Sequence, residues 1–347
     1  MPGLVGSLLG LGNPLLDVIA DVDQAYLDKY ELKLGNQILA EEKHQPMFKE
    51  LSSQSKTQYV PGGATQNSIR VAQWMLQVPG ASSYFGCVGS DNFGNIMKQT
   101  AQDGGVNVQY LVDENTPSGT CATCINSGDR SLVANLASAN NYKVDHLKKP
   151  EQWKVVEQAQ VIYSAGFFIT VSPESIALTA KHCAEHNKIY CMNISAPFLC
   201  QVPPFKKSLL DTMPFIDFLF GNETEAQAFA ESEGWSERSI PAIALKISQF
   251  PKHSGVRPRV VVITQGSDPT VVSQCGQVRQ YPVIPLAKEK LVDTNGAGDA
   301  FVGGFLSQLV AGKDIPECVR AGAYAAHIVI QQSGCTFPAV PEGFSWS

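Results

Sequence analysis

A glycine-rich turn that opens a helix constrains this chain more than any other stretch. An extended, apolar approach at 290–292 leads into Gly-Ala-Gly-Asp at 296–299, and a helix is expected to follow. The first amides of a helix lack intrahelical partners, and the helix dipole adds positive potential there. The amides of Gly296, Ala297 and Gly298 could therefore stabilise a phosphate or a phosphoryl group in transfer.

Asp299 lies on the first turn of that helix, beside the predicted anion site. A carboxylate there can take the proton of an attacking hydroxyl group, a role typically worth about 10²–10⁴ in rate. The alternative is an ordinary glycine turn in which Asp299 only caps the helix. Gly303 and Gly304 lie inside the same helix, and each costs about 1 kcal/mol relative to alanine. Close packing or close ligand approach would explain that cost, which favours the functional interpretation.

From residue 82 onward, apolar runs alternate with amphipathic segments. Strands are expected at 84–88, 161–165, 189–193, 215–220 and 259–263, with helices at 95–102 and 173–186. Buried strands separated by helices predict an α/β fold, a doubly wound and mostly parallel sheet flanked by helices on both faces. Ligands of such sheets bind outside the carboxyl ends of the strands, and the motifs singled out here are expected to follow strands.

Two stretches depart from this alternation. Residues 116–140 have the pattern of a β-hairpin with a turn at 126–129. Gly62 and Gly63 stand between a strand and a helix expected over 69–76. A double glycine there can be a hinge or a surface against which a ligand lies, and the alternative is a plain loop.

The first apolar run, at 8–21, contains two polar residues, Asn13 and Asp17. As structural residues they would be a turn asparagine and an aspartate at a strand end. Gly10-Leu11-Gly12 lacks the third glycine of a dinucleotide-binding motif, and a second strand-like run follows in place of a helix. A Rossmann site is therefore excluded.

Two further pairs allow a structural and a functional interpretation. Asn222 and Glu225 are three residues apart after a strand, where they could cap a helix or face one point as ligands. Phe168 and Phe198 follow two successive strands, where phenylalanine usually belongs to the core. A purine also needs an aromatic slot, because each stacked base contributes roughly 1–3 kcal/mol.

These motifs resemble the signatures of the ribokinase-like (PfkB) family of sugar and nucleoside kinases, and the resemblance extends over almost the whole chain. It implies transfer of the γ-phosphoryl group of MgATP to the 5′-hydroxyl of adenosine, giving AMP and ADP, with Asp299 as the base. A kinase for another nucleoside or a sugar is the nearer alternative, and a non-catalytic nucleoside sensor the more distant one. The chain has no G-x-x-x-x-G-K-[ST] motif and is not a P-loop enzyme.

The resemblance also implies two domains. Residues 1–16, 65–115 and 140–347 would form a large α/β catalytic and ATP-binding domain. Residues 17–64 and 116–139 would form a small β-rich lid that covers the substrate.

By the same resemblance, individual residues receive roles. The substrate would contact Asn13, Asp17, Gln37, Leu39, Gly62, Gly63, Asn67, Cys121, Leu132, Leu136, Phe168, Phe198 and Asn295. ATP would contact Asn222, Thr264, Gly266 and Asn295, and Mg²⁺ would be held by Asn222 and Glu225 through water. Arg130 would reach the phosphates of ATP, or it would be a solvated turn residue, and both interpretations stay open.

Composition limits the partners. The net charge of −6 and the pI near 5.6 leave no basic excess for nucleic acid. The first apolar run is interrupted by polar residues and lacks a basic start, so neither a signal peptide nor a membrane span is expected. Nine cysteines without a disulfide framework indicate reduced thiols, and hence a cytoplasmic protein, with the nucleus as the alternative location. We expect a monomer.

Overall fold

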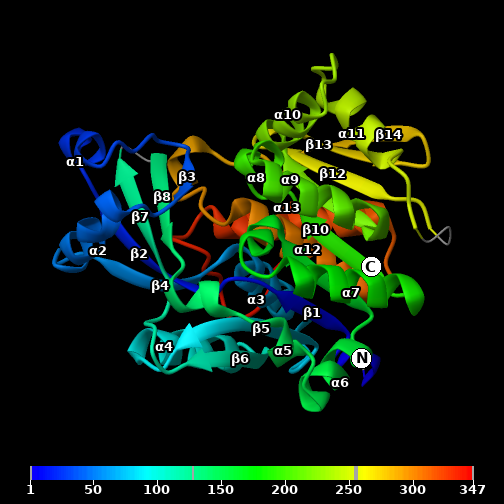
Figure 1. Cartoon of the computed structure of the whole chain (residues 1–347). Helices are drawn as coiled ribbons and strands as arrows, with labels where there is room; N and C mark the ends of the chain where they lie inside the picture. Colours follow the sequence, from blue (N-terminus) through cyan, green and yellow to red (C-terminus); the bar gives the residue numbers. More distant parts are fainter. Residues whose placement is uncertain (1, 127–128, 254–256, 346–347) are drawn as a thin grey trace.

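The computed structural model describes residues 2–126, 129–253 and 257–345, and within these residues the strands form two sheets (Figure 1). The larger sheet has nine strands in the order β14-β13-β12-β11-β10-β9-β1-β5-β6. Their bounds are β1 Leu8–Leu11, β5 Ser82–Gly89, β6 Asn107–Asp113, β9 Val161–Ala165, β10 Ile189–Asn193, β11 Phe218–Asn222, β12 Val260–Gln265, β13 Asp268–Gln274 and β14 Gln277–Tyr281.

The strands from β12 to β6 pair in parallel, and β13 and β14 extend the sheet antiparallel. The predicted doubly wound, mostly parallel sheet is therefore confirmed. The strand expected from 215 begins only at Phe218, because Met213–Phe215 forms a 3-10 turn that includes Pro214.

Helices cover both faces of this sheet. On one face lie α3 (Ala64–Leu76), α12 (Ala297–Val310) and α13 (Ile315–Val329). On the other lie α6 (Pro150–Gln158), α7 (Pro173–Glu185), α9 (Pro203–Thr212), α10 (Glu223–Ser232) and α11 (Ile240–Ser248). Successive residues of a strand point to opposite faces, so Leu8 belongs to the core under α12 and Leu9 to the core under α7 and α10.

The two glycines inside α12 allow close helix packing. A Cβ atom at Gly303 would lie 2.5 Å from the carbonyl oxygen of Ser68 in α3. A Cβ atom at Gly304 would lie 2.3 Å from the carbonyl oxygen of Ala321 in α13. Of the two explanations expected for these glycines, close packing is therefore the one that the structure bears out.

The smaller sheet has five strands in the order β3-β8-β7-β2-β4 among the described residues, and it lies to one side of the large sheet (Figure 1). The strands are β2 Leu15–Asp21, β3 Gln37–Leu39, β4 Gln58–Gly62, β7 Thr120–Asn126 and β8 Asp129–Asn135. The antiparallel pair of β7 and β8 confirms the predicted hairpin, although turn residues 127–128 lie outside the described part. Strand β2 begins two residues before the predicted start of the lid at residue 17.

Further helices and 3-10 turns complete the fold. They are α1 Gln24–Lys29, α2 Gln45–Ser52, α4 Asn92–Asp103, α5 Val144–Leu147 and α8 Pro197–Gln201, with 3-10 turns at Pro2–Leu4, Glu42–His44, Ala137–Asn141, Gly166–Thr170, Met213–Phe215 and Lys288–Lys290. None of the helices within the described ranges combines the length and the apolar character needed to cross a bilayer.

Two local expectations are wrong. The helix expected over 69–76 begins at Ala64, so Asn67 lies on its first turn and not in a loop. No strand precedes the turn at 296–299, because Lys288–Lys290 forms a 3-10 turn and exposed coil follows it. Asp299 is therefore an exception to the expectation that every motif follows a strand.

Candidate active site

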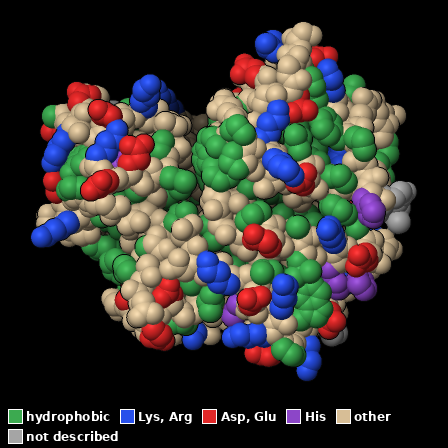
Figure 2. All heavy atoms as spheres, in the orientation of Figure 1, with side chains coloured by type: hydrophobic (Ala, Val, Ile, Leu, Met, Phe, Trp, Pro, Cys, Tyr) green, Lys and Arg blue, Asp and Glu red, His purple; other side chains and the backbone are tan. Residues whose placement is uncertain are grey.

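A cavity of about 440 Å³ opens between the small sheet and the carboxyl ends of β9 to β12. The molecular surface is hollowed between the part built on the small sheet and the part built on the nine-stranded sheet (Figure 2). Most predicted site residues line it: Asn13, Asp17, Gln37, Leu39, Gly63, Asn67, Cys121, Arg130, Leu132, Leu136, Phe168, Phe198, Asn222, Glu225, Thr264, Asn295, Gly296, Gly298 and Asp299. Gly62, Gly266 and Ala297 are not among the residues that line it.

Asp299 faces this cavity from the first turn of α12. Its Oδ2 atom accepts a hydrogen bond from Nδ2 of Asn67 at 3.0 Å. Burial by the surrounding protein raises the pKa of Asp299 from 3.8 to about 6, and the bond from Asn67 lowers it. The carboxylate is therefore ionised at neutral pH but remains a competent proton acceptor.

The glycine turn before Asp299 has the geometry of an anion site. Gly296 is the N-cap of α12, with a φ of 74° that favours glycine. The amide of Ala297 donates to the carbonyl oxygen of Thr294 at 3.2 Å. The amides of Gly296 and Gly298 donate no hydrogen bond within the described residues, so both are available to an anion.

Asp293 fixes this turn, although the sequence did not single out its role. Its carboxylate accepts hydrogen bonds from the amides of Asn295 at 2.6 Å and Gly334 at 2.8 Å. It also forms an ion pair with Arg130 of β8, which links the small sheet to the turn. The Arg130 side chain is 8% exposed, so the interpretation of Arg130 as a solvated turn residue is wrong.

Asp17 of β2 is a second buried carboxyl group at the cavity. Burial, followed by repulsion from Asp299 and Asp293, raises its pKa to about 8. A Cβ atom at Gly62 would lie 2.3 Å from Oδ1 of Asp17, so only glycine leaves room for the carboxyl group. Gly62 therefore leaves space for the Asp17 carboxyl group without lining the cavity itself.

Asn13 lies close to the double glycine. Gly63 has a φ of 93°, and a Cβ atom there would lie 2.2 Å from the carbonyl oxygen of Asn13. Nδ2 of Asn13 donates to the carbonyl oxygen of Phe167 at 3.3 Å, whereas its Oδ1 has no partner in the described part of the chain. This buried acceptor is free to receive a hydroxyl group.

One wall of the cavity is apolar. Leu132 and Leu136 pack with Cys121 and Leu15 in a small cluster, and all four residues line the cavity. Phe198 is half-buried and lies 6.3 Å from the ring of Phe167. These side chains offer a slot for a flat apolar group.

Phe168, which was expected to contact the purine, offers less of its ring to the cavity than Phe198 does. Phe168 lines the cavity but is fully buried, and its ring packs 5.4 Å from Tyr142 in the core. Phe167, which the sequence did not single out, presents the more exposed ring. The strand β9 ends before both residues, so strand alternation gave no signal to choose between them.

Asn222 and Glu225 form a capping box at the start of α10. Oδ1 of Asn222 accepts from the amide of Glu225 at 2.8 Å, and the carboxylate of Glu225 accepts from the amide and Nδ2 of Asn222 at 3.0 Å each. Burial raises the pKa of Glu225 to about 7. The capping interpretation is confirmed, and both residues also line the cavity.

The sequence did not single out two hydroxyl groups that bind the backbone at the end of β9, those of Thr65 in α3 and Ser195 directly after β10. Oγ1 of Thr65 accepts from the amide of Ala165, and Oγ of Ser195 accepts from the amide of Gly166. Ser195 has a φ of 71°, a conformation that serine rarely adopts. The signal available was the pair of polar residues Asn193 and Ser195 at the end of the apolar run that forms β10.

The distal part of the predicted ATP site is more open. Thr264, at the end of β12, lines the cavity, whereas Gly266 lies in an exposed turn outside it. Gln37 and Leu39 of β3 lie at the opposite, small-sheet side, paired with β8. No cluster of three or more metal-binding His, Cys, Asp or Glu side chains occurs among the residues described.

The chain is similar to known kinases over most of its length. Residues 24–342 match the model of the pfkB family of carbohydrate kinases. The chain is 60% identical to adenosine kinase 1 of Arabidopsis thaliana over 337 residues, with 97% of both chains covered. It is 44% identical to the adenosine kinase of Dictyostelium discoideum, with 96% of both covered.

Solved structures give the same picture. The adenosine kinase of Anopheles gambiae in complex with P1,P4-di(adenosine-5) tetraphosphate has a TM-score of 0.93 and 46% identity, covering 96% of this chain and 99% of that one. The adenosine kinase of Schistosoma mansoni in complex with 2-fluoroadenosine has a TM-score of 0.94 and 35% identity, covering 98% and 99%.

Proposed function

The chain belongs to the pfkB family of carbohydrate kinases, and we propose that it phosphorylates adenosine with ATP. The γ-phosphoryl group moves to the 5′-hydroxyl, giving AMP and ADP. The observation that carries the proposal is Asp299 beside the glycine turn, in a cavity that also has an apolar wall and buried acceptors. The two relatives and two solved structures described above carry adenosine kinase in their names.

In this proposal Asp299 is the general base. It takes the proton of the 5′-hydroxyl as that oxygen bonds to the γ-phosphorus and the bond to the bridging oxygen of ADP breaks. The amides of Gly296 and Gly298 point their positive ends at the transferred group, where charge stabilisation is usually the largest single contribution. The amide of Ala297 contributes less, because Thr294 already accepts its hydrogen bond.

The nucleoside lies between the two sheets. Asp17 and Asn13 bind the ribose hydroxyls. Oδ1 of Asn13 has no partner among the described residues, and a buried acceptor of this kind gains most from a hydroxyl donor. The purine lies against the apolar wall formed by Leu132 and Leu136, near Phe198. A free sugar would leave that wall without a partner.

ATP extends from the glycine turn toward β11 and β12, with Asn222, Thr264, Gly266 and Asn295 near it. Arg130 and its partner Asp293 lie beside the phosphates. Mg²⁺ would be held by the phosphates and, through water, by Asn222 and Glu225, whose oxygens are already engaged in the helix cap. When bound, the ion neutralises charge on the transferred group.

The small sheet acts as a lid in this proposal. Residues 17–64 and 116–139 close over the nucleoside, and Gly62 and Gly63 provide the hinge. Closure excludes water, which would otherwise hydrolyse ATP. We also propose that the protein is a cytoplasmic monomer.

The test is ADP release by the purified protein with MgATP and a panel of adenosine, inosine, guanosine, ribose and fructose. Turnover with adenosine well above the others is the expected result. Turnover with only a sugar would contradict the assignment of the apolar wall to a purine. Absence of turnover with every acceptor would favour the nucleoside sensor.

A further inference from the structure

Asn67 lies on the first turn of α3, and its side chain faces the base on α12. The Nδ2–H group donates to Oδ2 of Asp299 at 3.0 Å, between residues 232 positions apart. Asn67 is 4% exposed, so little water competes for this bond. Resting on the proposed function, we propose that Asn67 is a positioning residue that holds the Asp299 carboxylate toward the attacking hydroxyl.

The direction of the hydrogen bond follows from the chemistry of the two groups. An ionised carboxylate only accepts hydrogen bonds, so the amide nitrogen of Asn67 must face it. The Oδ1 atom of Asn67 is then turned away from Asp299, and it has no partner among the residues described. The same side chain can therefore orient the base and still offer an acceptor to a ligand.

Close packing of two helices makes this contact possible. The backbone amide of Asn67 donates to the carbonyl oxygen of Gly63 at 2.9 Å, which fixes Asn67 on the first helical turn. The next residue, Ser68, presents the carbonyl oxygen that a Cβ atom at Gly303 would approach to 2.5 Å. Glycine at 303 thus sets the separation of α3 and α12 at which Asn67 reaches Asp299.

The bond also sets the proton affinity of the base. Other titratable groups that interact electrostatically with Asp299 come from β2, β9, α10 and the segment after α13: Asp17, Tyr163, Glu225 and Cys335. None of these carries a positive charge. Burial raises the pKa of Asp299, and the hydrogen bond from Asn67 opposes that rise.

The first test is the pH dependence of kcat for Asn67→Leu, which keeps the number and branching of the side-chain heavy atoms and removes the donor. The acid limb should move up by about one pH unit, because the ionised base loses its hydrogen bond. At neutral pH kcat should fall about 10- to 100-fold through loss of orientation, with a smaller change in the KM for adenosine. A raised KM with an unmoved acid limb would overturn the proposal.

A second pair of variants tests the packing. Gly303→Ala should push α3 away from α12 and move the acid limb in the same direction as Asn67→Leu. Gly304→Ala meets a carbonyl at a similar distance but on the α13 side. It should lower the thermal midpoint without moving the limb. An acid limb that stays in place in Gly303→Ala, or moves equally in both variants, would count against the proposal.

A direct titration separates this inference from the proposed function. Carboxyl ¹³C NMR of ligand-free protein should show a higher Asp299 pKa in Asn67→Leu than in the wild type. This measurement needs no turnover, so it decides on Asn67 even if adenosine proves not to be the substrate. Equal pKa values in the two proteins would overturn the positioning role.

Discussion

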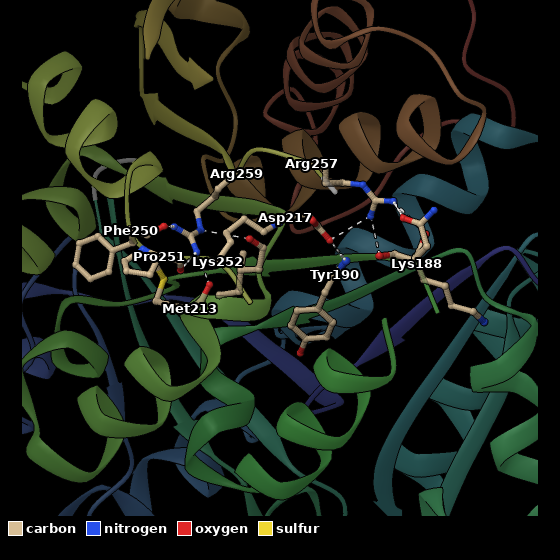
Figure 3. Close-up of polar contacts among 11 residues, drawn as sticks. Lys188, Tyr190, Met213, Asp217, Phe250, Pro251, Lys252, Arg257 and Arg259 are labelled. Carbon is tan, nitrogen blue, oxygen red and sulfur yellow. Dashed lines mark hydrogen bonds and ion pairs between the residues drawn. The ribbon is translucent and has the colours of Figure 1, made fainter. Parts of the chain in front are cut away.

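Buried polar clusters lie at both the amino ends and the carboxyl ends of the strands in the nine-stranded sheet. The two clusters differ in how many of their polar groups have hydrogen-bond partners. At the amino ends of β10 to β12, the guanidinium of Arg259 is almost fully buried and donates to five backbone carbonyls (Figure 3). Asp217 lies beside it and accepts from Lys252, Arg257 and the amide of Tyr190. Every charged group of this cluster has its partners within the fold.

The cluster at the carboxyl ends is different. Oδ1 atoms of Asn13 and Asn67 lack partners among the described residues, and burial holds the pKa values of Asp17 and Asp299 at about 8 and 6. Unsatisfied buried acceptors are costly in a structure that only needs to fold. Oδ1 of Asn13 and Oδ1 of Asn67 belong to residues that line the cavity, which indicates groups kept for a ligand, whereas the paired cluster serves stability.

Asp299→Asn should give the largest effect on activity. We expect kcat to fall by about 10²–10⁴, because the base is lost while substrate binding remains. The thermal midpoint should not fall, since the variant removes a buried charge. Steady-state kinetics and differential scanning fluorimetry would check both; a large loss of stability would show that Asp299 also supports the fold.

Arg259→Met should produce the reverse pattern. Removing the guanidinium leaves buried carbonyls without donors, which we expect to cost about 3–5 kcal/mol in the free energy of unfolding. Activity per folded molecule should persist, because Arg259 is remote from the cavity. Arg238→Met is the matched control: this arginine also donates to backbone carbonyls, of Trp235 and Glu237, but it is exposed. Urea denaturation would measure the free energy of unfolding of both variants. Equal losses would contradict the stabilising role of the buried cluster around Arg259.

Lys252→Met tests the ion pair within the paired cluster. Asp217 would keep Arg257 and the Tyr190 amide, so the loss should be smaller, about 1.5–3 kcal/mol. Lys207→Met removes an exposed partner of Asp211 and should cause no measurable change. A loss in Lys252→Met as small as in Lys207→Met would show that burial adds nothing to this pair.

The sequence predicted the regular parts of this comparison well. The strands at 161–165 and 189–193 have their predicted bounds, and Asn222 with Glu225 forms the predicted cap. Both features depend on neighbours in the sequence, where apolar runs and capping residues are visible. Most residues assigned to the site by resemblance also line one cavity.

Features that depend on tertiary packing were not predictable. Helix α3 begins at Ala64 without a capping side chain, through Thr65 and other weak helix formers, so packing against α12 stabilises its first turn. The ion pair of Arg130 with Asp293 joins distant segments, and no local pattern indicates it. The contact of Asn67 with Asp299 is missed for the same reason.

The smallest predicted difference between the two clusters is in how stability depends on pH. The pKa of Asp17 is about 8 in the folded protein and 3.8 ordinarily, so the native state binds more protons between these values. Stability should therefore fall as pH rises through this window, by about 1 kcal/mol between pH 7 and pH 8. In Asp17→Asn most of this decrease should disappear, and the remainder should come from Glu225, whose pKa is about 7.

Urea denaturation of both proteins at several pH values would measure the difference. Between pH 5 and pH 7 the decrease should become smaller in Asp17→Asn but should not vanish, because Glu225 and Asp299 have raised pKa values of about 7 and 6. The remaining decrease is the internal control, since it depends on carboxyl groups that the substitution leaves in place. If the free energy of unfolding changed identically with pH in both proteins above pH 7, Asp17 would already be ionised in the cavity. Burial of this cluster would then destabilise the fold less than its unpaired groups indicate.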